Sequence, residues 1–68
     1  MARKYTDGMG YGDLLRNSRP IGEYFSALKN AGLPKSWSGL KMVGSWSDVT
    51  FWVDADGNIW EEYVPTFD

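Results

Sequence analysis

An apolar stripe with helical spacing marks the middle of the chain. Its members recur at i, i+3, i+4 and i+7, so on a helix they would share one face. Pro20 suits the first helical position, where its missing N–H costs nothing. The pattern predicts a helix over 20–31. The stripe consists of Ile21, Tyr24, Phe25 and Leu28.

The end of this helix is also marked. Gly32 suits the left-handed residue that follows a helix, and Pro34 blocks continuation. Leu33 would then touch Leu28, which is the hydrophobic contact of a Schellman ending. We therefore expect Gly32 to have a positive φ angle.

Beyond the helix, the pattern changes from helical spacing to runs rich in β-branched and aromatic residues. Such runs favour strands, which are predicted over 40–45, 49–53 and 59–64. The segment 54–57, Asp-Ala-Asp-Gly, is typical of a hairpin connection with glycine in the left-handed region.

This hairpin fixes a register if Asp54 pairs with Asn58. Side chains of a strand alternate between the two faces of a sheet, and a slip of one residue would exchange the faces. The face expected to receive the helix stripe carries Val49, Phe51, Val53, Ile59 and Tyr63. The opposite face carries Thr50, Trp52, Trp60 and Glu62.

The fold class predicted from these elements is α+β, with one main helix packed on a three-stranded antiparallel β-meander. Residues 1–68 are expected to form a single domain. Within it, 1–12 is an irregular glycine-rich arm, 13–34 is helical and 40–64 is the sheet. Asp13 could cap one short helical turn after the arm.

The chemistry available to the chain is limited. It contains neither cysteine nor histidine, which excludes disulfides, thiolate metal sites and histidine-activated nucleophiles. Asp54–Asn58 lacks the spacing of a calcium loop, and the adjacent Glu61 and Glu62 would point to opposite faces. We expect a protein that is not an enzyme and has no metal or cofactor.

Charge is distributed unevenly along the chain. Residues 1–41 hold seven basic and three acidic residues, whereas residues 42–68 hold six acidic and no basic residues. The two halves could pack so that their fields partly cancel, or they could give the molecule a basic and an acidic end.

The main functional hypothesis is a protein-binding module. Four tryptophans around a one-helix core are hard to bury together, and an exposed tryptophan patch with acidic neighbours is typical of a binding hot spot. The partner would be a protein with a basic surface, such as one that handles nucleic acids. The expected contact residues are Trp52, Trp60, Glu62, Asp54, Asp56 and Glu61.

Two alternatives stay open. One is a small nucleic-acid-binding protein in which cations contact phosphates and aromatic rings stack on bases. The other is an accessory subunit of a larger assembly, and the sequence does not determine the oligomeric state. The residues of the first alternative are Arg3, Lys4, Tyr5, Arg16 and Arg19.

The general profile resembles, in type only, the small inhibitors that phages and mobile elements encode against host machinery, such as anti-CRISPR proteins. No motif carries that resemblance. The N-terminal segment lacks the apolar stretch of a signal peptide, and no run is long enough for a transmembrane helix. Together with the absence of cysteine, this predicts a cytoplasmic protein without a membrane partner.

Overall fold

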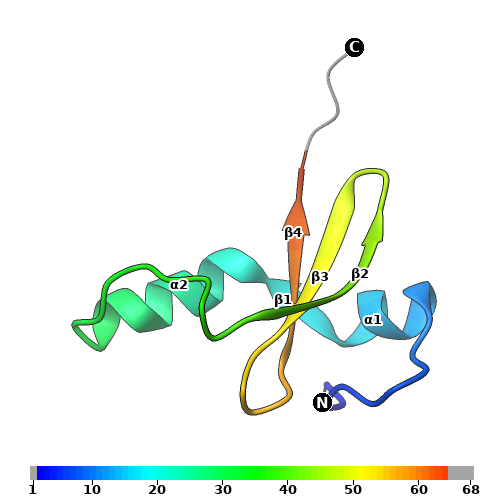
Figure 1. The fold of residues 1–68 in the computed structure, drawn as a ribbon, viewed down its shortest axis with the longest axis horizontal. Coiled ribbons are helices and arrows are strands. Elements are labelled where there is room, and N and C mark those ends of the chain that lie inside the picture. Colours follow the sequence, from blue (N-terminus) through cyan, green and yellow to red (C-terminus); the bar gives the residue numbers. More distant parts are fainter. Residues whose placement is uncertain (1, 65–68) are drawn as a thin grey trace.

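The computed structural model describes residues 2–64 and shows an α+β fold with two helices and a four-stranded mixed sheet. The sheet has the strand order β1-β4-β3-β2 (Figure 1). The predicted α+β class is confirmed. In chain order the elements are α1 (Tyr11–Asn17), β1 (Ser18–Pro20), α2 (Ile21–Asn30), β2 (Lys41–Trp46), β3 (Val49–Val53) and β4 (Ile59–Tyr63).

The predicted meander and its register are confirmed. Strands β2, β3 and β4 are antiparallel neighbours, and Trp52 lies opposite Trp60. Gly57 has a φ angle of 84° and donates its N–H to the Asp54 carbonyl at 3.0 Å. The Asp54 N–H bonds the Asn58 carbonyl at 3.1 Å, as the hairpin pattern requires.

The sheet contains a fourth strand, so the prediction of three strands is wrong. Ser18, Arg19 and Pro20 form β1, which pairs in parallel with the outer edge of β4. The physical reason is local. Pro20 disfavours a helical conformation at Arg19, and the extended segment can then pair with an otherwise open sheet edge.

The apolar core lies on the predicted face of β3 and β4, but a different helix covers it. Val49, Phe51 and Ile59 pack there against Leu14, which comes from α1 and has no exposed surface. Partly buried side chains around this cluster come from the N-terminal arm and the strands, namely Tyr5, Met9, Val43 and Val53. No residue of α2 belongs to the cluster, which corrects the expected packing of the main helix.

Helix α1 begins earlier than expected. Gly10 occupies the N-cap position, so the irregular arm ends there and Asp13 lies inside the first turn. Asp13 does not cap the helix but forms an ion pair with Arg16 at 2.8 Å. A start at Tyr11 places this ring one turn before Leu14, so both side chains reach the sheet.

Helix α2 ends as the sequence predicts. Gly32 has a φ angle of 76°, the Leu33 N–H bonds the Leu28 carbonyl, and the Gly32 N–H bonds the Lys29 carbonyl. These are the two hydrogen bonds of a Schellman ending. At the other end the helix begins at Ile21, and Pro20 is its N-cap and not its first helical residue.

Candidate functional site

Trp52 and Trp60 lie on the predicted face, and each indole N–H has a carboxylate partner. The Trp52 Nε1 donates to Glu62 Oε1 at 3.2 Å, and the Trp60 Nε1 donates to Asp54 Oδ2 at 3.0 Å. Both bonds run diagonally between β3 and β4, where long side chains can reach each other. The predicted tryptophans therefore lie opposite each other, and each is hydrogen-bonded to one of the predicted acids.

This face is not open, which corrects the expectation that it lies away from the main helix. The Tyr24 ring of α2 lies 5.6 Å from the Trp60 ring, and the Trp37 ring lies 5.0 Å from the Trp52 ring. Phe25 of α2 packs behind Trp37 at 4.9 Å. As a result, Trp60 is only 7% exposed and Trp52 is half-buried.

The Asp54 side chain stabilises the hairpin turn through hydrogen bonds. Its carboxylate accepts the backbone N–H groups of Asp56 and Asn58, the Asn58 side-chain amide and the Trp60 indole N–H. Partial burial alone would raise the pKa of Asp54. The four hydrogen bonds together outweigh it and hold the pKa below its ordinary value.

The remaining predicted acids lie apart. Asp56 is exposed at the tip of the hairpin, and Glu61 lies on the core face, where it accepts the Ser18 hydroxyl at 2.6 Å. The six predicted contact residues therefore do not form a single surface. They are divided between the tryptophan face, the core face and the hairpin turn.

A surface that the sequence pattern does not predict lies where β4 ends. The exposed rings of Tyr11, Trp46 and Tyr63 gather there on the core side of the sheet. The Tyr11 and Trp46 rings are 4.9 Å apart, and both contact Phe51. Trp46, Val49 and Tyr63 form one row across the three strands. We call this surface the aromatic end and include in it Glu61, which hydrogen-bonds the Tyr63 phenol, and Asp48, whose backbone carbonyl accepts the Val64 N–H at 3.0 Å.

Two features organise the aromatic end. The Trp46 ring packs directly against the backbone of Gly44. A Cβ atom at this position would lie only 2.7 Å from the ring, so a side chain larger than glycine's would displace it. The pKa of the Tyr63 phenol is raised, first by its hydrogen bond to Glu61 and then by the negative charges nearby. Sequence alternation had already placed Tyr63 on this face. It gave no indication that Tyr11 and Trp46 would join it.

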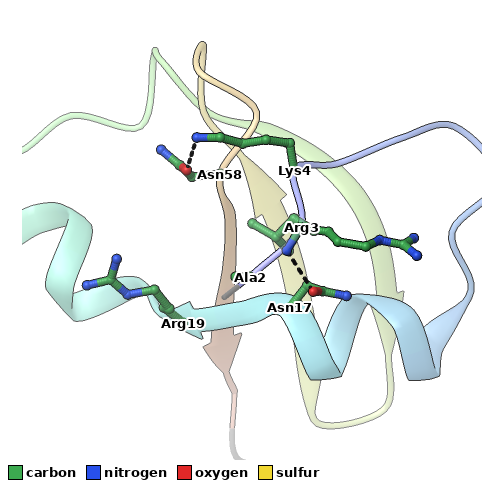
Figure 2. Close-up of a pocket in the computed structure, with 7 residues that line it drawn as sticks. Ala2, Arg3, Lys4, Asn17, Arg19 and Asn58 are labelled. Carbon is green, nitrogen blue, oxygen red and sulfur yellow. Dashed lines mark hydrogen bonds between the residues drawn. The ribbon is translucent and has the colours of Figure 1, made fainter.

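Three of the predicted basic residues surround one pocket (Figure 2). The pocket has a volume of about 270 Å³ and lies between the N-terminal arm, β1 and the start of β4. Its lining comprises Ala2, Arg3, Lys4, Asn17, Arg19, Asn58 and Ile59.

The other two residues of the nucleic-acid alternative lie outside the pocket lining. Arg16 is ion-paired with Asp13 on α1, and Tyr5 packs against the core while its N–H bonds the Gly57 carbonyl at 2.8 Å. The structure therefore brings three of the five residues of the nucleic-acid alternative to one pocket and places the other two outside its lining.

Within residues 2–64, no three acidic, histidine or cysteine side chains gather as a group that could hold a metal ion. In the same range, no helix is long and apolar enough to cross a membrane.

No protein-family model, curated protein or solved structure matches this chain.

Proposed function

We propose that the chain is a non-catalytic protein-binding module and that its contact surface is the aromatic end. The observation that carries the proposal is the exposure of three aromatic side chains on one side of the sheet, of which Tyr11 and Trp46 are in ring contact. Tyr11 and Trp46 are each 41% exposed, and Tyr63 is 58% exposed. Tryptophan and tyrosine are, with arginine, the residue types most enriched at the energetic centres of protein interfaces.

The aromatic end is also held in place before any partner binds. Trp46 is the last residue of β2, and its ring is fixed between Tyr11, Phe51 and the bare backbone of Gly44. A side chain that is already ordered loses little conformational entropy on association. This favours a direct contact role for Trp46.

Charge supports a basic partner. Residues 42–64 contain five acidic and no basic residues, and two of these acids, Asp48 and Glu61, belong to the aromatic end and raise the pKa of Tyr63. Complementary charge speeds encounter and selects the partner. A protein that handles nucleic acids offers such a basic surface, and covering it would inhibit nucleic-acid binding.

The experiment compares two tryptophans of similar exposure. Trp46→Ala and Trp37→Ala are made in the full chain, since Trp37 is 38% exposed but lies on the opposite side of the sheet. Circular dichroism establishes that both variants fold, and calorimetry measures their affinity for the partner isolated with the wild-type chain. We expect Trp46→Ala to weaken binding by about 2 kcal/mol or more, roughly 30-fold, and Trp37→Ala to leave it nearly unchanged.

Other outcomes would reject the proposal. A folded Trp46→Ala variant with full affinity excludes the aromatic end as the contact surface. A loss confined to Trp37→Ala would move the contact to the side covered by α2. A shift of an oligonucleotide in a gel, weakening steeply with salt, would favour the nucleic-acid alternative. A stable homo-oligomer that buries Trp46 would favour a structural subunit.

A further inference from the structure

We propose that the pocket between the N-terminal arm, β1 and β4 binds one phosphate group of a small phosphorylated molecule. This site lies at the start of β4, whereas the aromatic end lies where β4 finishes. It is therefore independent of the proposed protein contact. Its main features are an uncompensated lysine, an arginine with unused donors and a cavity of limited size.

Lys4 is one of the three cations that line the pocket. Its Nζ donates to the neutral Asn58 side-chain oxygen at 2.6 Å and forms no ion pair within residues 2–64. In Figure 2 the Lys4 side chain extends toward Asn58, and the amine ends at the Asn58 side-chain oxygen. An ammonium group has three donors, so two stay available for the oxygens of an anion.

Arg19 supplies the second side of the pocket. Its guanidinium pairs with Glu23 through Nε and Nη2, both to the same carboxylate oxygen. Of the five guanidinium donors, those on Nη1 are not used in this pair, and arginine suits the geometry of phosphate oxygens. The backbone at Arg19 is fixed because β1 pairs with β4 there.

Arg3 adds charge at the edge of the site. Figure 2 shows its guanidinium extending away from the Lys4 amine, while its backbone N–H bonds the Asn17 side chain at 2.8 Å. The guanidinium is exposed and forms no ion pair in the part of the chain that the structure describes. It can therefore turn toward an anion without breaking an ion pair.

The dimensions favour a single phosphate over a nucleic-acid strand. A volume of about 270 Å³ is below the roughly 300–1,000 Å³ of pockets that enclose drug-sized ligands. A strand requires a basic groove that follows several phosphates. Here Glu23 pairs with Arg19, Asp13 pairs with Arg16, and Asp54 bonds the Asn58 side chain, so the cations do not form a continuous basic groove.

The test is an NMR titration of the full chain with inorganic phosphate at constant ionic strength, with chloride as the reference anion. We expect saturable shifts of the backbone amides of residues 2–4, 17–19 and 58–59. Lys4→Gln should weaken binding about tenfold, which corresponds to one lost charged hydrogen bond. Lys29→Gln, which removes the same charge from an exposed position on α2, should leave binding unchanged.

A second variant keeps the result decisive if Lys4→Gln does not fold. Arg3→Gln changes an exposed side chain and should weaken binding by a smaller factor. The proposal is overturned if the shifts do not saturate, or if Lys29→Gln weakens binding as much as Lys4→Gln, since either result indicates diffuse charge attraction.

The ligand class is tested with two further probes. A nucleoside 5′-monophosphate should bind at least as well as inorganic phosphate. A single-stranded oligonucleotide without terminal phosphate groups that bound more tightly, with steep salt dependence, would overturn the small-ligand assignment and favour nucleic acid. Trp46→Ala should leave phosphate binding intact, so failure of this proposal and failure of the protein-binding proposal can be told apart.

Discussion

The two faces of the β3–β4 hairpin are built from alternate residues of the same strands, yet they are stabilised differently. On the core face, Val49, Phe51 and Ile59 are at most 2% exposed and pack against α1. On the tryptophan face, Trp52 stays half-buried, and both indole N–H groups bond carboxylates. One face depends on apolar burial, and the other combines aromatic packing with polar contacts.

The two helices also differ in how deeply their side chains are buried. Helix α2 has the clear amphipathic stripe, but none of its residues is fully buried. Helix α1 has only seven residues and a weak sequence pattern, but its Leu14 is completely buried. The strength of a helix pattern therefore does not determine how deeply the helix is buried, because burial depends on which sheet face the helix reaches.

The largest expected effect comes from replacing two adjacent residues of β3, one on each face of the sheet, by alanine. Phe51→Ala should lower the free energy of unfolding by about 3–5 kcal/mol, because a completely buried ring leaves a cavity. Trp52→Ala should cost less, because its ring already contacts solvent. Urea denaturation followed by circular dichroism measures both, and a variant already unfolded without urea counts as the larger loss. A greater loss for Trp52→Ala would show that the tryptophan face, and not the core face, contributes more to stability.

A similar pair compares the two helices. Leu14→Ala in α1 should cost about 2–5 kcal/mol, whereas Leu28→Ala in α2 should cost less because Leu28 is only partly buried. Thermal and urea unfolding of the two variants under the same conditions give the difference. Equal losses would show that α2 contributes as much to the core as α1.

The smallest expected effect concerns pH and the hydrogen bonds of Asp54. Its pKa is lowered in the folded state, so its contribution is fully present above the unfolded pKa of about 3.9. The contribution is lost as the pH falls through the lower folded pKa. Asp54→Asn should therefore be less stable at neutral pH and show a weaker decline in the free energy of unfolding below about pH 4.

The matched control for this effect is Asp56→Asn. It removes a charge from the same turn but leaves the Asp56 backbone N–H bonded to Asp54. Urea denaturation at a series of pH values should give this variant a decline close to that of the wild type. If the two variants declined equally, the pH dependence would come from the overall charge of the turn.

Local sequence determined the parts of the fold that depend on neighbouring residues. The Schellman ending needs only Gly32 and the leucines beside it, and the hairpin needs only the turn from Asp54 to Asn58. Because side chains alternate along a strand, the turn also fixed the two faces of β3 and β4. The sequence also contains the basic residues Arg3, Lys4 and Arg19, which line the pocket beside the N-terminal arm.

Only the tertiary structure decided which helix covers which face. The stripe of α2 is compatible with either apolar surface of the sheet, and β1 could be recognised only once β4 offered an open edge. The aromatic end is likewise formed only by the tertiary structure. Tyr11, Trp46 and Tyr63 come from three separate elements, and no local pattern encodes the distances between residues so far apart in the chain.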